Sequence, residues 1–250
     1  MDAQLAAEVA VVEHSLKNGA KPVFGYKISI IIPALNEASN IEETLTPLQP
    51  LRSAGHEVIL SDGGSNDRTT AIAKPLVDKI VSSQPGRAVQ MNRGAEQAVG
   101  DILWFLHADA IPPPSVDSII IDCLASRSKV WGRFDVRLSG SNPIFRLIEF
   151  MMNQRSCITG IATGDQGIFM LRYAFDQVNG FSEIPLMEDI AMSTKLKGIK
   201  SPACIEQKLI VSSRKWEENG IIKTVMLMWW LRLAYFFGAS PGYLAKQYYS

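Results

Sequence analysis

Runs of β-branched residues alternate with amphipathic stretches along the first half of the chain. The run KISIII at 27–32 ends at Pro33, which is typical of a buried parallel strand. Within 38–48, Ile41 and Leu45 then recur at helical spacing. Further strands are expected at 57–62, 79–83 and 101–109, and helices after residue 62 as far as Pro75, over 88–98 up to Gly100, and over 115–125.

The second half has a less regular pattern. We expect strands at 130–138 and within the Gly-rich segment 160–171, and helices at 143–156 and at 188–197, the last ended by Gly198. Four successive strand–helix units in the first half predict an α/β fold, an open and mostly parallel Rossmann-like sheet flanked by helices. Ligands of such sheets bind beyond the carboxyl ends of the strands.

The two ends of the chain differ from this central region. Residues 3–17 are expected to form a short helix before a linker, and they lack the pattern of a signal peptide. Residues 221–238 are mostly apolar but contain Lys223 and Arg232. A central Arg costs roughly 2.5–3.5 kcal/mol in a membrane span, so a core-packed helix is favoured over an interfacial helix or a span. The expected divisions are 1–26, a domain over 27–216, and a C-terminal apolar helical segment over 217–250.

Composition narrows the classes of partner. Twenty-five basic residues balance 25 acidic ones, so no overall field favours nucleic acid, and no nucleic-acid partner is expected. The three cysteines are widely spaced, which argues against a disulfide framework or a zinc site. A cytoplasmic protein is expected, with contact at the inner face of the cell membrane as an open alternative.

Asp62 is the first residue with candidate chemistry. It closes the strand expected at 57–62, and Gly63 and Gly64 follow it. A carboxylate at a strand end can bind the edge of a nucleotide base, and glycines let the backbone approach closely. The alternative is a simple turn, since Asp and Gly are common turn residues, with Asp67 as the cap of the next helix.

His107 and Asp109 follow the strongly apolar strand expected at 101–109. If the chain stays extended, both side chains point the same way and can hold Mg²⁺ or Mn²⁺ together with substrate phosphates. A directly bound imidazole would favour manganese. The alternative is a hydrogen-bonded loop histidine beside an Asp that caps the next helix.

Other charged residues lie at expected helix starts. Glu188 and Asp189 open the helix at 188–197, where the helix dipole alone accounts for carboxylates, although a general base needs the same residue type. Arg87 and Asn92 lie around another helix start, where they can bind a diphosphate or form a solvated face. The same two interpretations apply to the segment 212–216.

Six segments, taken in this order, resemble the family-2 glycosyltransferases, whose catalytic domain has the GT-A fold. They are ISIIIPALNEASNIEETL (28–45), VILSDGGSNDRTT (58–70), GRAVQMNRGA (86–95), ILWFLHADAIPP (102–113), GDQGIFMLR (164–172) and FDQVNGFSEIPLMEDIAMSTKLK (175–197). The resemblance covers residues 27–216. LHADA, GDQG and the C-terminal tail are also similar to a bacterial subgroup, the radical-SAM/selenodomain-associated transferases.

The resemblance implies a role for each matching residue. Asp62 matches the carboxylate that binds the base, Asp109 the last Asp of the D-x-D metal motif, and Asp189 the catalytic base of the E-D motif, with Glu188 beside it. His107 stands in place of the first Asp, which leaves metal identity and metal dependence open. Residues expected at the donor are Pro33, Ala34, Asn36, Glu37, Gly63, Arg87, Asn92, His107, Arg214 and Trp216, the last two near the Q-x-x-R-W position of the family, whose spelling differs here.

The function implied by the resemblance is inverting transfer of a single sugar from a UDP- or GDP-linked donor to a hydroxyl acceptor, assisted by Mn²⁺ or Mg²⁺. The acceptor is not identified, and the aromatic residues of 221–238 leave a lipid or apolar acceptor at a membrane surface open. Two other functions also stay open. One is a sugar nucleotidyltransferase, although no lysine-rich Gly loop follows the first strand, and the other is a non-catalytic nucleotide-sugar-binding protein.

Overall fold

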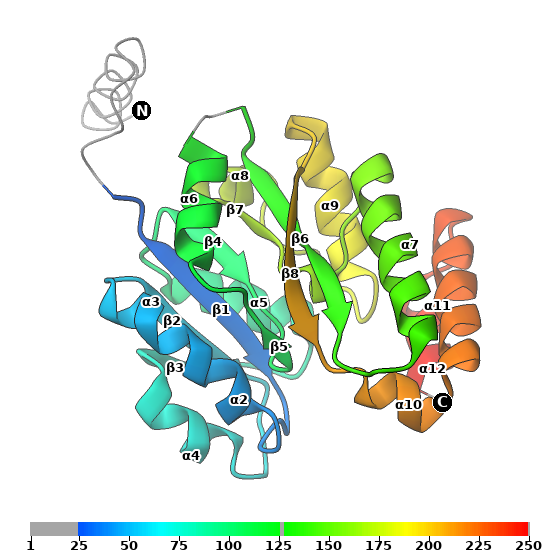
Figure 1. Cartoon of the computed structure of the whole chain (residues 1–250), viewed down its shortest axis with the longest axis horizontal. Coiled ribbons are helices and arrows are strands. Elements are labelled where there is room, and N and C mark those ends of the chain that lie inside the picture. Colours follow the sequence, from blue (N-terminus) through cyan, green and yellow to red (C-terminus); the bar gives the residue numbers. More distant parts are fainter. Residues whose placement is uncertain (1–24, 126–127, 250) are drawn as a thin grey trace.

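A single curled sheet with helices around it forms the centre of the molecule (Figure 1). The computed structural model describes residues 25–125 and 128–249. In these ranges eight strands lie in the order β3-β2-β1-β4-β7-β6-β8-β5. The expected α/β architecture is confirmed, and the helix expected at 3–17 lies outside the described residues.

The first four strands are parallel and form the more regular part of the sheet. Gly94, in the helix α5, lies so close to β1 that an added Cβ would come within 2.5 Å of the Ile31 side chain. A glycine here therefore lets the helix pack tightly on the sheet. The elements are β1 (Ile28–Ala34), α2 (Ile41–Leu45), α3 (Gln49–Ser53), β2 (Glu57–Asp62), α4 (Thr69–Ala73), β3 (Lys79–Ser82), α5 (Arg87–Gln97) and β4 (Ile102–Phe105), with 3₁₀ turns at Thr46–Leu48 and Lys74–Leu76.

The second part of the sheet mixes directions. Strand β7 is antiparallel to both β4 and β6, whereas β6 and β8 are parallel and β5 pairs antiparallel with β8. Helix α7 packs against β6 through buried polar contacts, in which Glu149 accepts from the Leu138 amide at 2.6 Å. The elements are β5 (Ala110–Ile111), α6 (Val116–Ala125), β6 (Trp131–Leu138), α7 (Pro143–Thr159), a 3₁₀ turn at Gly164–Gln166, β7 (Phe169–Leu171), α8 (Arg172–Gln177), α9 (Glu188–Ile199) and β8 (Ala203–Val211).

Several expected boundaries differ from the structure. Strand β1 continues through Pro33, because its pairing with β4 stops at Ile31 and no bond on that side needs the missing proline N–H. The helix expected over 38–48 begins at Ile41, and the strand expected over 101–109 stops at Phe105. Helix α9 passes through Gly198, which lies in open space, and ends at Ile199. Helix α8 and strand β8 were not expected.

The C-terminal segment forms three helices, α10 (Arg214–Asn219), α11 (Ile221–Phe236) and α12 (Pro241–Tyr249). Helices α11 and α12, together with Leu186 and Met187, form a second, small apolar cluster in which Leu231 is the buried residue of α11. The prediction of a core-packed helix over 221–238 is wrong, because packing covers one side of α11 and leaves the other exposed. None of the described helices meets the length and hydropathy needed to cross a bilayer.

Cys157 of α7 and Cys204 of β8 form a disulfide, with their Cα atoms 5.8 Å apart. The expectation that no disulfide forms is wrong for this pair. The two residues are 47 positions apart in the sequence, so only the pairing of β6 with β8 and the packing of α7 on β6 bring them together.

Candidate active site

Polar side chains gather where β1, β2 and β4 end. These strands are parallel, so their carboxyl ends share one edge of the sheet, and Ala34, Asp62 and His107 lie at or just after those ends. Helix α5 begins beside the same edge, because a side chain in its first turn, Gln90, bonds to the ends of β1 and β2. Polar side chains therefore gather at the edge where the sequence predicted a site, and their role in binding stays a prediction.

Asp62 is buried, with 6 % of its surface exposed. Its Oδ2 accepts hydrogen bonds from the amides of Gly64 and Ser65 at 3.1 and 3.0 Å, which is the turn that the sequence allowed. Its Oδ1 is buried and has no hydrogen-bond partner in the protein. A buried acceptor of this kind costs ~1–3 kcal/mol unless a ligand supplies a donor. One oxygen of the carboxylate therefore stabilises the turn, and the other is available to a ligand.

Gln90 joins the ends of the first two strands, a role that the sequence did not indicate. Its Nε2 donates to the carbonyls of Ala34 and Ser61 at 2.7 and 3.0 Å. A Cβ on Gly63 would lie 3.0 Å from the Gln90 side chain, and the Gly63 amide donates to Ala34. Gly63 thus permits this close approach, and the expected donor residues Ala34 and Gly63 are in one hydrogen-bonded group with Asp62.

Hydrogen bonds connect the loop after β1 with the loop after β2. Asn36 has a φ of 56°, a left-handed conformation that Asn tolerates, and its Oδ1 accepts from the Asn66 amide at 3.0 Å. The Glu37 amide donates to Thr69, and Asp67 accepts from the Ala38 amide at 3.1 Å. Asp67 lies before the cap position of α4 rather than at it. These bonds give Asn36 and Glu37 a bracing role, and their contact with a nucleotide stays a prediction.

The backbone turns after β4 instead of staying extended. The Ala110 amide donates to the His107 carbonyl at 3.2 Å, so the expectation that His107 and Asp109 lie along an extended strand is wrong. His107 Nδ1 lies 3.2 Å from Asp165 Oδ1. A Cβ on Gly164 would come within 2.3 Å of His107 Nε2, so this nitrogen packs against the glycine. The segment 164–165 thus pairs with Nδ1 through Asp165 and packs against Nε2 through Gly164.

Asp165 belongs to the same cluster and was missed, because G-D-Q-G is also typical of a plain turn. The pKa of Asp165 is lowered to about 2: its desolvation would raise the pKa, but the hydrogen bond and charge of His107, with the charges of Arg87 and Arg232, outweigh it. The side chain nevertheless keeps 38 % of its surface exposed, so solvent screens these interactions in part.

Glu188 and Asp189 open α9, as expected, and lie beside His107 and Arg87. Asp189 Oδ2 accepts from the Gly164 amide at 2.8 Å and Oδ1 from the Ile190 amide at 2.7 Å. Burial and then the charge of Asp189 raise the pKa of Glu188, and Arg87 opposes this shift. The preceding residue, Met187, has a φ of 71°, which is unusual for a side chain of this size and indicates a constrained position.

Arg87 and Asn92 lie on α5 but have different surroundings. Arg87 Nη1 lies 3.8 Å from Glu188 Oε1, which connects the start of α5 with the start of α9. The Asn92 side chain forms two hydrogen bonds with the backbone of Phe181, both 2.9 Å long. Asn92 therefore braces the loop before α9, and its contact with a donor stays a prediction.

Two arginines lie behind this cluster. Arg155 of α7 has its Nε and Nη2 buried without a hydrogen-bond partner, while its Nη1 donates to the Ile161 carbonyl. Burial, followed by the charge of Arg232 in α11, lowers the pKa of Arg155 to about 10, and Asp189 opposes the shift. The charges of α7, α9 and α11 thus act on one another close to Asp189.

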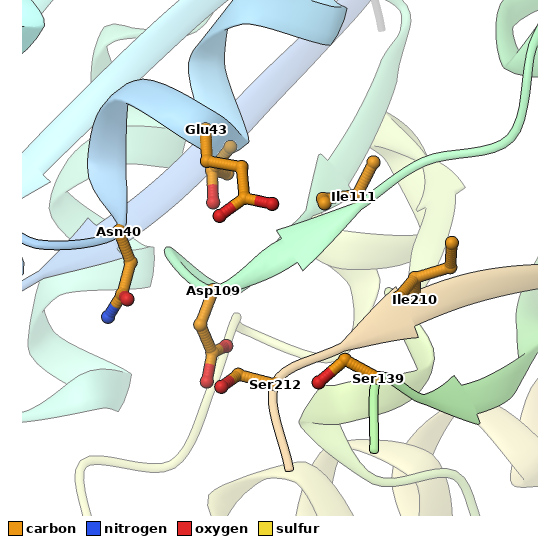
Figure 2. Close-up of a pocket in the computed structure, with 8 residues that line it drawn as sticks. Asn40, Glu43, Asp109, Ile111, Ser139, Ile210 and Ser212 are labelled. Atoms are coloured by element: carbon orange, nitrogen blue, oxygen red, sulfur yellow. The ribbon is translucent and has the colours of Figure 1, made fainter. Parts of the chain in front are cut away.

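Asp109 lines a separate pocket (Figure 2). Its side chain points toward Ser212, while Glu43 of α2 and Asn40, just before that helix, line the pocket from the side of α2. Among the described residues, no group of three or more His, Cys, Asp or Glu side chains is arranged to hold a metal ion. A metal here would need one protein carboxylate and oxygens of a substrate.

Arg214 extends from α10 to the loop after β1. Its Nη1 donates to Ser39 Oγ at 3.3 Å, close to the pocket that Asn40 and Asp109 line. Trp216 is half-buried and packs against the main core. Arg214 is therefore near the expected donor loop, whereas Trp216 has a packing role.

Contacts connect the expected site residues along one edge. Gln90 and Arg87, on one helix, link the Asp62 region to Glu188. Gly164 contacts both His107 and Asp189, and His107 is two residues from Asp109. Contacts thus connect the Asp62 region with Asp189, whereas Asp109 lines a pocket that neither of them borders, and a common cleft for the three carboxylates stays a prediction.

Known proteins with similar sequences are glycosyltransferases. An uncharacterized glycosyltransferase of Mycobacterium tuberculosis (strain CDC 1551 / Oshkosh) is 31 % identical over 136 residues, 51 % of this chain and 52 % of the relative. The dolichol-phosphate mannosyltransferase of Pyrococcus furiosus is 30 % identical over 111 residues, 42 % of this chain and 32 % of the relative. The chain spans about half the length of the first relative.

Solved structures of other proteins share the fold. S. aureus TarS 1-349 superimposes with a TM-score of 0.61 at 16 % identity, covering 75 % of this chain and 60 % of TarS. Glucosyl-3-phosphoglycerate synthase from Mycobacterium tuberculosis, in complex with Mn²⁺, UDP and glucosyl-3-phosphoglycerate, gives a TM-score of 0.56 at 20 % identity, covering 74 % and 71 %. The GT-A fold is therefore confirmed. Residues 29–178 match the model of glycosyl transferase family 2, and the chain belongs to that family.

Proposed function

We propose that the protein transfers a single sugar from a UDP- or GDP-linked donor to a hydroxyl group of an acceptor, with inversion at the anomeric carbon. The observation that carries this proposal is the buried Asp62 Oδ1, which lacks a partner within the protein at the carboxyl edge of the sheet. Uracil and guanine both offer an N–H donor that would satisfy this oxygen. The nucleotide would then be held at one end of the contacts that lead to Asp189.

Asp189 is the proposed general base. Its two amide bonds, from Gly164 and Ile190, orient the carboxylate at the start of α9. In the transfer step the acceptor oxygen attacks the anomeric carbon, its proton passes to Asp189, and the bond from that carbon to the diphosphate oxygen breaks. The binding energy of the nucleotide at Asp62 would position the sugar for this attack.

A divalent cation, Mn²⁺ or Mg²⁺, fits part of the expected metal motif. Asp109 lines a pocket with polar neighbours and is a suitable oxygen ligand, whereas His107 Nδ1 is paired with Asp165 and its Nε2 is packed against Gly164. We therefore assign Asp109, and not His107, to the cation. When bound, the cation supplies positive charge for the departing diphosphate.

The protein also supplies cations of its own for the diphosphate. Arg87 lies at the start of α5, and His107 Nδ1 lies 3.2 Å from Asp165 Oδ1. We propose that these two side chains face the diphosphate, where positive charge is most valuable as negative charge develops on the leaving group. Arg214, bonded to the loop after β1, is proposed to cover the diphosphate from the opposite side.

Two narrower proposals concern the subgroup within the family and the contact with a membrane. The similarity to the radical-SAM/selenodomain-associated subgroup rests on LHADA, GDQG and the C-terminal tail alone. Contact of segment 217–250 with the inner face of the cell membrane, and a lipid or apolar acceptor, are supported by its exposed aromatic residues and by the dolichol-phosphate mannosyltransferase among the relatives.

Asp189→Asn tests the proposed reaction. Slow hydrolysis of UDP- and GDP-sugars by the purified protein with Mn²⁺ should fall by roughly 10²–10⁴-fold, while donor affinity stays unchanged. Asp122→Asn, at an exposed position of α6, is the matched control. Hydrolysis near the wild-type rate would remove Asp189 from this role. Pyrophosphate among the products would indicate a nucleotidyltransferase, and binding without any turnover would indicate a non-catalytic sugar-nucleotide binder.

A further inference from the structure

Helix α11 exposes an apolar stripe along one side. Its exposed large residues recur at helical spacing and include the most exposed apolar side chain of the described chain, Phe236 at 81 %. The opposite side of the helix packs on α12 and on Leu186 and Met187. A surface helix normally presents polar residues to water, so this pattern is the reverse of the usual one. The stripe consists of Ile222, Met226, Trp229, Trp230, Leu233 and Phe236.

Helix α7 adds a second apolar stripe. Its inner side is held to β6 by Glu149 and by Asn153, which donates to the Val136 carbonyl at 3.1 Å. Its outer side exposes Leu147, Phe150 and Ile158. Helices α7 and α11 lie next to each other in Figure 1, and the interaction between Arg155 and Arg232 agrees with that placement. We call the two stripes together the apolar face.

The charges around the apolar face indicate what covers it. The segment 220–249 contains no Asp or Glu, and two of its cations, Lys223 and Lys246, are exposed. Trp230 and Tyr243 also lie in ring contact, 6.5 Å apart, and such amphipathic rings favour the boundary between lipid headgroups and acyl chains. An anionic bilayer complements both the apolar and the cationic residues. A second copy of the chain would instead bring the same cations together.

Helices α7 and α11 also carry charged residues that interact with the candidate active site. Arg232 lies on α11 away from the stripe, and its charge acts on Asp165 of the site. Arg155 of α7 interacts with Asp189, the proposed base. The two helices that expose apolar residues on the outside thus carry charged residues of the site on the inside.

We propose that the apolar face of α7 and α11 rests on an anionic lipid bilayer and that the acceptor hydroxyl is carried by a membrane lipid, which reaches Asp189 from that side. This identification of the acceptor rests on the proposed transfer, whereas the docking itself does not. The proposed docking extends the expected membrane contact from the C-terminal segment to α7. It also orients the candidate active site toward the membrane.

Sedimentation with vesicles tests the docking. The full chain should sediment with phosphatidylcholine vesicles that contain phosphatidylglycerol, and much less with phosphatidylcholine alone. The double variant Trp229→Glu/Phe236→Glu should lower the partition coefficient at least roughly tenfold. Leu147→Glu should also weaken binding, because Leu147 is exposed on the outer side of α7. Tyr173→Glu, at an exposed aromatic residue of α8, is the control and should bind like the wild type.

The outcomes separate docking from transfer. Donor hydrolysis without vesicles should be unchanged in the double variant, which also shows that the variant is folded. Equal sedimentation of wild type and double variant would overturn the proposal. So would a dimer in analytical ultracentrifugation that the double variant abolishes, because a second copy would then cover the face. If the vesicles bind but a lipid extract never accepts labelled sugar while a water-soluble extract does, the lipid acceptor is wrong and the docking stands.

Discussion

The two halves of the candidate site are built differently. Around Asp62 the polar side chains bond to backbone groups: Gln90 joins two strand ends, and Asn36 holds the neighbouring loop. Around Asp189 charged side chains face one another, with His107 beside Asp165 and Arg87 beside Glu188. In the first half, hydrogen bonds to the backbone fix the loops, and one buried oxygen, Asp62 Oδ1, has no hydrogen-bond partner. The second half is a cluster of interacting charges.

This difference separates two requirements of a transferase. Hydrogen bonds between neutral groups fix geometry without depending on pH, which suits the recognition of a nucleotide. Neighbouring charges shift one another's pKa values, which suits groups that move protons and stabilise a leaving group. Substitutions in the first half should therefore change donor affinity, and those in the second should change turnover, stability and pH dependence.

Asp62→Ala should have the largest effect on nucleotide affinity. Loss of the only buried oxygen proposed to receive the base should weaken binding of UDP or GDP roughly 10–100-fold in isothermal titration calorimetry. Asp122→Ala removes a carboxylate from an exposed position of α6 and should leave the affinity unchanged. Equal affinity of both variants would mean that the base binds elsewhere and that the first half has no such role.

Gly164→Ala should affect the second half alone. The new Cβ would collide with His107 Nε2, and the glycine amide also holds Asp189, so both side chains must shift. The free energy of unfolding should fall by ~1–3 kcal/mol in denaturant titration, and donor hydrolysis should decrease without loss of nucleotide affinity. Gly198→Ala is the control, since its Cβ meets open space within α9 and should stabilise the protein by ~0.4–1 kcal/mol. A Gly164→Ala variant as stable and active as the wild type would contradict the packing described for His107.

The smallest effect is expected from Asp165→Asn, and it should depend on pH. The pKa of Asp165 in the folded protein is about 2, below its ordinary value of 3.8, so its stabilising contribution is present above about pH 4 and is lost as the pH falls toward 2. Because the side chain is partly exposed, the loss in the variant should be ~0.5–1 kcal/mol near pH 5. The difference from the wild type should narrow by about pH 3, measured by denaturant titration. A difference that is constant with pH would show that Asp165 acts through shape and not through charge.

The sequence predicted the regular part of the fold well because burial there follows simple periodicity. Strands β2 and β3 begin where expected, and α5 differs by one residue at each end. Strand β8 was missed because its middle residues, 206–208, are exposed and charged or polar, so no apolar run marks it. The disulfide between Cys157 and Cys204 depends on tertiary contacts that no spacing reveals.

The candidate site was predicted in part. Asp62, Glu188 and Asp189 were identified because a strand end and a helix start mark their positions. Gln90 was not, since an amide inside a helix gives no signal of a bond to two strand ends. Asp165 was hidden within a Gly-rich turn, and its importance depends on His107 reaching it across the chain.

The turn after β4 has a consequence for how the chain can vary. Strand β5 follows β4 after four residues, yet β4 is fourth and β5 eighth in the order of the sheet. In a flat sheet, four strand spacings would place β5 about 19 Å from β4. The five residue steps from Phe105 to Ala110 can span only ~17 Å, so the sheet must bend back on itself. Residues 106–109 therefore set the curvature of the sheet. Insertions would be tolerated poorly in this segment. Added residues would disturb the pairing of β5 with β8 at the far edge of the sheet and would separate Asp109 from Ser212.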